Sequence, residues 1–384
     1  MYSEEDINSA VAAGALSADA ATSFRAHMTR VREIPRGDEE NFRLINSFND
    51  IFVTIGVIIL LLAVGSIGGT LGGALGSDSL LGSMISIFVP SIMVAGASWF
   101  LAEIFTRRRR MALPSIILLI SFVSAVFGTA LAVAALPVGT VLGINAFTDQ
   151  AFKDSTVADA TAAIAAAIVV LGAGAVTVWA TWQHWQRFMV PITIATGAAA
   201  VVGSVIGAIA MANQILTNGE GNLPILPIVL AAGIATFAFA MLWDMSDRER
   251  TTRRSDVAFW LHLLAAPMIA HPLFYSLGVM GGNGTVGVPG ALGVLAIYVL
   301  FGLVAVAIDR RALLVSALAY VLVALGFLFD RFGVVELTFA LTALVIGSAL
   351  LTLSAFWAPI RARVVSRLPG DWQMRLPVAG VAAA

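Results

Sequence analysis

The residues best suited to chemistry lie in one of the most apolar stretches of the chain, APMIAHPLFYSLG, residues 266–278. His271 is the one titratable side chain near the middle of a predicted spanning helix over 257–279, about 4–5 Å from its midplane at 1.5 Å per residue. A histidine changes charge near neutral pH and can relay a proton. We therefore take His271, with Tyr275 one turn further on, as the candidate intramembrane site.

Pro267 and Pro272 flank His271 and allow two interpretations. Each proline removes a backbone hydrogen bond of the helix and bends it. A neutral His271 that satisfies a freed carbonyl would then be a packed structural group. Discontinuous helices also line the binding sites of transporters, in which case the histidine belongs to a pathway.

Composition assigns the protein to the membrane class. The 384 residues are 59% hydrophobic and 12% charged, with a mean hydropathy of +0.93, whereas soluble domains are roughly 45–50% apolar and 25% charged. A spanning helix needs about 20 apolar residues, and ten such runs occur, over 48–69, 84–105, 111–135, 157–180, 189–211, 224–243, 257–279, 289–308, 312–329 and 335–357. The expected fold is an all-α, polytopic bundle of about ten transmembrane helices.

Arginine marks one side of this predicted bundle. All but two of the 22 basic residues, Lys153 and Arg331, fall before the first run, after an even-numbered run or in the tail. Because loops rich in Lys and Arg stay in the cytoplasm, both termini are expected there. The expected organisation is a cytoplasmic helical segment over 1–47, a transmembrane domain over 48–358 and a basic amphipathic tail over 359–384.

The N-terminal segment predicts short helices. One begins after Ser3 and ends at Gly14, a second is capped by Ser17 and covers 18–33, and a third covers 38–48. Such helices could bind a protein partner. The segment carries more acidic than basic residues, which disfavours nucleic acid as a partner.

The tail is expected to lie on the membrane. Arg361, Arg363 and Arg367 alternate with apolar residues in PIRARVVSRLP. This pattern is typical of a short interfacial helix whose basic side chains face anionic lipid headgroups.

Glycines are concentrated in GSIGGTLGGALG, residues 65–76. They form two series with a spacing of four residues, namely Gly65, Gly69 and Gly73, and Gly68, Gly72 and Gly76. In a helix these series would give two adjacent flat stripes for close helix packing. The stretch could equally be a flexible outer loop, because glycine destabilises helices.

No motif for catalysis or metal binding occurs in the sequence. The absence of cysteine excludes disulfides, thiolate metal sites and cysteine nucleophiles. Pairs of histidines with metal-ligand spacing and serine nucleophile motifs are also absent. No cofactor or metal is expected, and an enzyme is disfavoured, although a site could still assemble from residues distant in sequence.

The stretches AVAAGALSADAATSFR and FRLINSFNDIFVTIG, residues 10–25 and 42–56, resemble a group of uncharacterised bacterial membrane proteins. Those proteins combine a small helical cytoplasmic N-terminal segment with a many-helix membrane domain. The resemblance implies a bacterial inner membrane, and it implies no activity and no catalytic residues.

Two functions are consistent with these patterns. The first is a permease-like transporter of a small solute, with the helix that contains His271 lining the path. The alternative is a non-transporting membrane sensor, scaffold or assembly module that acts through residues 1–47. Membrane lipids are expected contacts in either case.

Overall fold

The computed structural model describes residues 4–33, 48–76, 80–141, 156–217, 223–250, 252–278, 288–331 and 338–377. Every element within these ranges is a helix, which confirms the all-α fold. Eight of the described helices are long and apolar enough to cross a membrane, and they correspond to the first eight predicted runs. They are α3 (Phe48–Leu75), α4 (Leu80–Ala102), α5 (Ala112–Val141), α6 (Thr156–Phe188), α7 (Ile192–Leu216), α8 (Ile225–Ser246), α9 (Arg253–Ser276) and α10 (Val288–Ile308). A π-helix, η1 (Glu103–Arg108), continues α4.

The last two predicted spans have a different form. The apolar part of α11 (Ala312–Arg331) covers only Leu313–Phe329, which is shorter than a typical span. Helix α12 (Thr338–Ala355) is followed by α13 (Trp357–Val365) at an angle of 74°. The described residues thus contain eight candidate spans. If α12 and α13 together form one bent span, the number is nine. A tenth span, at α11, stays a prediction.

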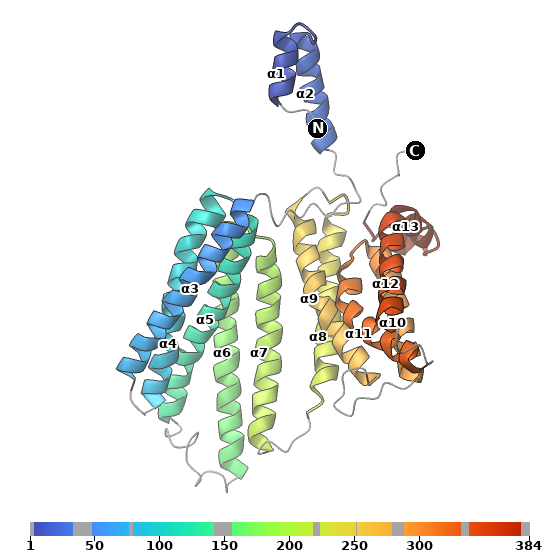
Figure 1. Ribbon diagram of the computed structural model, residues 1–384. Helices are drawn as coiled ribbons and strands as arrows, with labels where there is room; N and C mark the ends of the chain where they lie inside the picture. Colours follow the sequence, from blue (N-terminus) through green and yellow to red (C-terminus); the bar gives the residue numbers. More distant parts are fainter. Residues whose placement is uncertain are drawn as a thin grey trace.

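Arginine-rich turns gather on one side of the bundle (Figure 1). This arginine-rich side holds the η1–α5, α6–α7, α8–α9 and α10–α11 turns, and α3 begins and α12 ends at it. Each of the four turns contains one non-glycine residue with a left-handed backbone, at φ between 53° and 58°: Arg110, Met189, Arg250 and Asp309. Side chains with a β carbon disfavour this conformation, so the surroundings of each turn must hold it in place.

The membrane helices form two groups (Figure 1). The first group is α3–α7 and the second is α8–α13. The largest apolar core lies within the second group and includes Phe274 of α9, Phe301 of α10 and Val321 of α11. Apolar contacts between the groups lie near the arginine-rich side, where Ala195 of α7 packs with Leu261 of α9. The groups are therefore joined mainly at one end.

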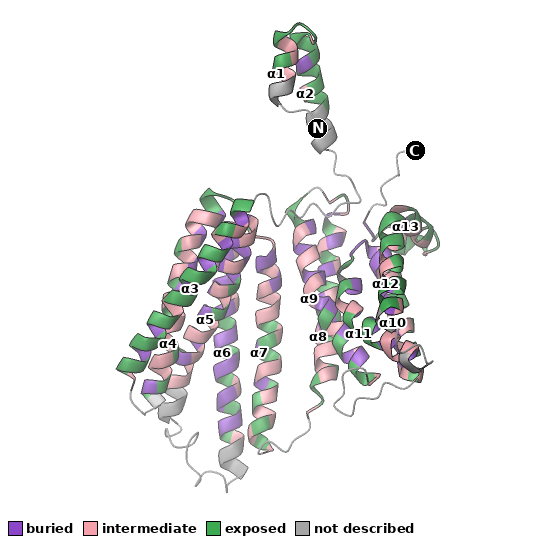
Figure 2. Cartoon of the chain, viewed as in Figure 1, coloured by how far each residue is buried: buried purple, intermediate pink, exposed green. Residues whose placement is uncertain are grey.

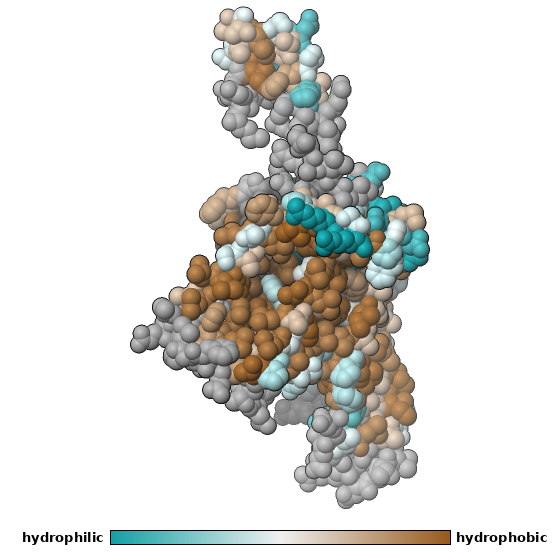
Figure 3. Space-filling model, turned by 90° about the vertical axis from the view of Figure 1, so that its right-hand side faces the viewer, coloured by the Kyte–Doolittle hydropathy of each residue, from teal (hydrophilic) through white to brown (hydrophobic). Residues whose placement is uncertain are grey.

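The outward faces of the helices are apolar. Large exposed hydrophobic side chains include Leu62 of α3, Trp179 of α6 and Leu303 of α10, and exposed residues follow the outer faces in Figure 2. Figure 3 shows an apolar surface over the helices, with hydrophilic side chains gathered toward the arginine-rich side. These apolar faces imply contact with lipid, and the chain is an integral multi-pass membrane protein.

The glycine stretch is helical, because α3 continues to Leu75, and the loop alternative was wrong. A β carbon on Gly68 would lie 2.5 Å from Cα of Pro90 in α4, and one on Gly72 would lie 3.0 Å from Cα of Ser86. Backbone atoms of α3 and α4 therefore approach each other as closely as glycine permits.

The two glycine series differ in their surroundings. Gly76, directly after α3, would place a β carbon 2.8 Å from the carbonyl oxygen of Gly82, so it continues the close approach of Gly68 and Gly72. A β carbon on Gly65 would be in ordinary contact with Val94, whereas those on Gly69 and Gly73 would meet no atom within 4 Å. Tight packing on α4 thus involves one series rather than two.

The N-terminal segment contains a helical hairpin, as predicted. Helices α1 (Glu4–Ala12) and α2 (Ala18–Glu33) pack together. Gly14 between them has φ +70°, a conformation that glycine adopts without strain. The hydroxyl of Ser17 accepts a hydrogen bond of 3.2 Å from the backbone of Ala20, as expected of an N-cap. Ser3 lies outside the described residues, as do all but the last residue of the predicted third helix.

Candidate functional site

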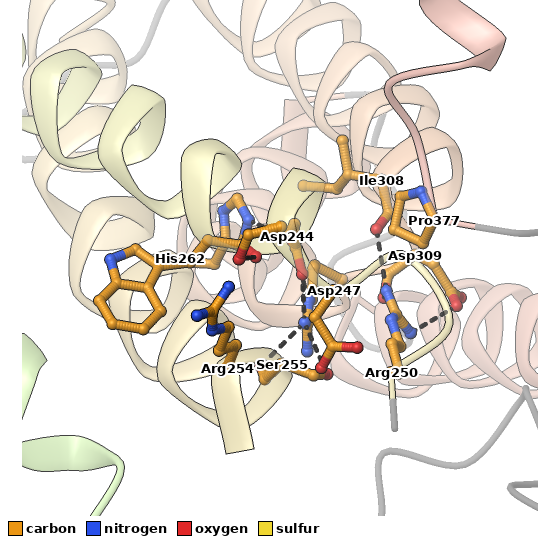
Figure 4. A network of polar contacts seen from close by, with 12 residues as sticks. Asp244, Asp247, Arg250, Arg254, Ser255, His262, Ile308, Asp309 and Pro377 are labelled. Atoms are coloured by element: carbon orange, nitrogen blue, oxygen red, sulfur yellow. Dashed lines mark hydrogen bonds and ion pairs between the residues drawn. The ribbon is translucent and has the colours of Figure 1, made fainter. Parts of the chain in front are cut away.

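A buried group of ionisable side chains lies at the arginine-rich ends of α8 and α9 (Figure 4). The carboxylate of Asp244 accepts a hydrogen bond of 2.9 Å from Nε2 of His262 and one of 2.5 Å from Nη2 of Arg310. The same guanidinium also donates to the backbone oxygen of Ser255, at 3.0 Å. Asp244 and His262 are 0% exposed and Arg310 is 2% exposed. Asp244, His262, Arg310 and Ser255 are called the first charge cluster below.

Charged side chains that are buried in this way need partners of opposite charge. A buried carboxylate or guanidinium without a partner costs several kcal/mol, on the order of the stability of a whole domain. The Asp244 carboxylate and the Arg310 guanidinium neutralise each other, so a neutral His262 with its hydrogen on Nε2 leaves the first charge cluster without net charge. Its Nδ1 has no hydrogen-bond partner among the described residues.

A second charge cluster surrounds Asp309 in the α10–α11 turn. Nη1 of Arg250 lies 2.6 Å from one carboxylate oxygen, and Nε1 of Trp357 donates to the other at 2.6 Å. Arg361 approaches the same carboxylate at 3.8 Å. Arg250, Asp309, Trp357 and Arg361 thus join the α8–α9 turn, the α10–α11 turn and α13.

The electrostatics of Arg250 reflect this setting. Burial is the main cause that lowers the pKa of its guanidinium, and nearby Arg310 lowers that pKa further, while Asp309 raises it. An arginine nevertheless stays protonated in proteins. Its charge is therefore retained at the cost of desolvation and is balanced by the Asp309 carboxylate.

The C-terminal segment is held by α13 and by the α8–α9 turn. Nη2 of Arg361 donates to the backbone oxygen of Pro377 at 2.7 Å. Nε of Arg248 donates to the backbone oxygen of Leu376 at 2.8 Å, and its Nη2 reaches that of Gln373 at 3.3 Å. The segment after α13, which contains the short helix α14 (Gly370–Gln373), is therefore fastened across the arginine-rich side of the second group.

This geometry corrects the prediction for Arg361. The sequence pattern places its side chain on lipid headgroups, yet it is 2% exposed and faces Asp309 and Pro377. The sharp bend before α13 folds this helix back over the end of α10, so that one of its basic residues points inward. Arg363 and Arg367 are exposed and remain available to headgroups.

Asp244 and His262 were not among the candidate site residues predicted from the sequence. The structure brings both into the first charge cluster. One signal in the sequence could have found them. Asp244, His262 and Arg310 all lie near the arginine-rich ends of their predicted helices, and so at a similar predicted depth. Ionisable groups at membrane depth tend to pair with one another.

His271 has a partner that the sequence analysis did not foresee. Its Nδ1 lies 2.6 Å from the hydroxyl of Tyr320 in α11. The ring of Tyr275 is 6.0 Å from the imidazole, centroid to centroid. Helix α9 runs without a break through Pro267 and Pro272, of which the first is exposed and the second buried. His271 itself is exposed on the surface of the helical domain, so it is not a packed core group.

A cavity of about 550 Å³ opens at the arginine-rich side between the two groups. The first group contributes η1, the start of α5 and the α6–α7 turn. The second group contributes Arg253, Asp256 and Trp260 from the first turns of α9. The volume is within the range of small-molecule sites, roughly 300–1,000 Å³.

Comparisons with known proteins leave the family open. No family model, no curated protein and no solved structure matches the chain. The resemblance drawn from residues 10–25 and 42–56 is supported only as far as the general class of polytopic helical membrane proteins. Within the part of the chain that the structure describes, no group of three His, Asp or Glu side chains is arranged to hold a metal ion.

Proposed function

We propose that the protein is a permease-like transporter of a small solute in the bacterial inner membrane, with the arginine-rich side and both termini in the cytoplasm. One observation supports this function above the others. A solute-sized cavity lies between two groups of membrane helices and opens at one membrane face. Alternating access by movement of one helix group against another needs such an arrangement.

The internal ties of the second group support the proposal. The two charge clusters link α8, α9, the α10–α11 turn and α13, so these elements would move as one body. Contacts between the groups are concentrated near the arginine-rich side. A rotation about that end would change the access to the cavity without breaking either charge cluster.

In this function α9 lines the path. It contributes Asp256 and Trp260 to the cavity at its arginine-rich end. His271 lies outside the cavity lining and would meet the solute further along α9, at mid-depth. The pair of His271 and Tyr320, together with Tyr275, would provide polar groups for a solute between the two faces. Pro267 and Pro272 remove hydrogen bonds of α9 there, which would make bending easier.

The test uses the absence of cysteine from the chain. Single variants Ala112→Cys in the cavity and His271→Cys at mid-depth are labelled in intact cells and in inverted membranes with a membrane-impermeant maleimide. Transport predicts labelling of position 112 from the arginine-rich side and of position 271 from the opposite side. Gln214→Cys, at the far end of α7, and Arg254→Cys, on the arginine-rich side, are exposed controls for the two faces. If position 271 remains unlabelled in membranes and in detergent while both controls react, the transport proposal fails.

A second function is favoured by the N-terminal hairpin. Helices α1 and α2 pack on each other and expose Phe24, at 41%, to solvent. An exposed aromatic side chain on a small helical unit is suited to a protein partner, and this supports a sensing, scaffolding or assembly role. Capture of a partner that is lost when residues 1–47 are deleted would support this role, whereas labelling of position 271 that survives the deletion would support transport.

A further inference from the structure

The cavity between the two helix groups is lined by more positive than negative side chains. Arg107, Arg110 and Arg253 contribute guanidinium groups, and Asp256 contributes the one carboxylate among the lining residues. Arg107 is partly neutralised, because its Nη1 lies 3.2 Å from Glu103. Arg110 and Arg253 form no ion pair within 4 Å of any described residue, although Arg253 interacts electrostatically with Asp256 on the same helix. Two guanidinium groups without a direct ion pair thus face one cavity from the two helix groups.

Three helices begin at the same cavity. Its lining includes Ala112 at the start of α5, Ile192 at the start of α7 and Arg253 at the start of α9. The amino end of a helix carries a partial positive charge of about half a unit and unpaired backbone N–H groups. The backbone therefore adds to the positive potential that the arginines produce.

Thr106 supplies an independent indication of a ligand. It lines the cavity, it is 8% exposed, and its hydroxyl oxygen has no hydrogen-bond partner among the described residues. A buried hydroxyl without a hydrogen-bond partner is uncommon in folded proteins, because its desolvation is then not compensated. A ligand oxygen in the cavity would accept the hydrogen of this hydroxyl.

We propose that this cavity is an anion-binding site that takes a phosphate group, carried either by a soluble phosphorylated solute or by the headgroup of an anionic phospholipid. Phosphate oxygens match the fork of an arginine and bind it by two parallel hydrogen bonds. Arg110 and Arg253 would hold the phosphate from opposite sides, and Thr106 would donate to a third oxygen. The indole of Trp260 forms an apolar wall for the remainder of the ligand.

The cavity lies at the ends of the candidate spanning helices α5, α7 and α9, where lipid headgroups are expected, so both sources would reach it. Basic pockets between transmembrane helices on the cytoplasmic side bind phospholipid headgroups. The cavity is also open to water at the arginine-rich side and has the volume for a small soluble solute. The inference rests on the proposed function in so far as it names the ligand of the same cavity, but binding is measured without transport.

The test is protection of a single thiol in the purified full-length protein. Met189→Cys lies in the lining and is 46% exposed in the wild type. Its reaction with a maleimide is followed against increasing inorganic phosphate in detergent, and in nanodiscs of phosphatidylglycerol or of phosphatidylcholine. Protection by inorganic phosphate identifies a soluble ligand. Protection in phosphatidylglycerol alone identifies a lipid headgroup.

Matched variants distinguish a specific phosphate site from a general effect of positive charge at the surface. R110Q with R253Q should weaken protection by about tenfold or more, because two charge-assisted hydrogen bonds are lost. R109Q with R254Q removes the neighbouring arginines, which do not line the cavity, and should alter protection by less than about twofold. D256N removes the opposing carboxylate and should strengthen protection, a gain that misfolding cannot produce.

The outcomes separate this inference from the transport proposal. It is overturned if neither ligand protects position 189, if R110Q with R253Q keeps wild-type protection, or if D256N binds no more tightly. The transport proposal instead fails if position 271 cannot be labelled. Protection at position 189 without access at position 271 would leave a phosphate site in a protein that does not transport.

Discussion

Nε2 of His262 and Oδ2 of Asp244 are 2.9 Å apart and have no access to solvent, although they lie on two different candidate membrane-spanning helices. Arg310 completes this contact from a third element. A buried pair of this kind adds little stability compared with an apolar pair, but it allows few alternative arrangements of α8, α9 and the α10–α11 turn. The first charge cluster therefore fixes how the second group is assembled.

Asp244→Asn should destabilise the protein strongly. The substitution leaves the Arg310 guanidinium buried without a carboxylate, which costs about 3–5 kcal/mol. The loss is measured by unfolding of the purified protein in mixed detergent. Asp371→Asn, on an exposed side chain of α14, is the control and should have almost no effect. Equal stability of the two variants would show that the first charge cluster does not hold the helices.

Restoring neutrality should recover much of that stability. The double variant Asp244→Leu with Arg310→Met removes both charges and keeps apolar volume. Replacement of a buried ion pair by hydrophobic residues is often neutral or stabilising by about 1–4 kcal/mol. We expect the double variant to be more stable than Asp244→Asn. A double variant that is less stable would mean that His262 depends on the carboxylate more than Arg310 does.

Arg361→Leu should release the C-terminal segment. Its guanidinium is buried and donates to the backbone of Pro377, whereas Arg363 on the same helix is exposed. Limited trypsin digestion at Arg367 and Arg375 reports the release, because proteases cleave chain that has left its contacts. Arg361→Leu should be cut several times faster than the wild type, and Arg363→Leu at the wild-type rate. Identical digestion of the two variants would contradict the fastening role of Arg361.

Two adjacent glycines of α3 should respond in opposite directions to alanine. Gly68→Ala places a methyl group 2.5 Å from Cα of Pro90, so α3 and α4 must move apart, at a cost of about 1–3 kcal/mol. Gly69→Ala meets no atom within 4 Å and should stabilise α3 by about 0.5–1 kcal/mol, because alanine favours a helix. Unfolding of both variants in detergent measures the difference. A stabilising Gly68→Ala would refute close packing at this contact.

Hydropathy predicts the membrane helices of this chain because spanning a bilayer constrains length and composition directly. The sequence runs locate α3 to α10 to within a few residues of most ends. The bend in the last run, between α12 and α13, was not predicted. It brings Trp357 into contact with Asp309, which is 48 residues away. Nothing in the local pattern around either residue encodes that contact.

The charge clusters were hidden for the same reason. Asp244 and Arg310 are 66 residues apart in the chain, and each on its own has the sequence context of an ordinary interfacial charge. The prediction for the basic tail was correct about the presence of a short helix, and it was wrong about Arg361 because amphipathic periodicity gives no information on a partner. Pairing of distant charges depends on the assembly of helices, which periodicity within one helix does not determine.

His271 and Tyr320 should show a measurable coupling energy, and His271 and Tyr275 should not. The imidazole Nδ1 is 2.6 Å from the Tyr320 hydroxyl, and either of these groups can donate the hydrogen bond. A double-mutant cycle with His271→Phe and Tyr320→Phe should give a coupling of about 0.5–1.5 kcal/mol in unfolding experiments. The matched cycle with Tyr275→Phe should give a value near zero, because the Tyr275 and His271 rings are 6.0 Å apart and no hydrogen bond joins them. A larger coupling to Tyr275 would mean that His271 turns toward its own helix instead of linking α9 to α11.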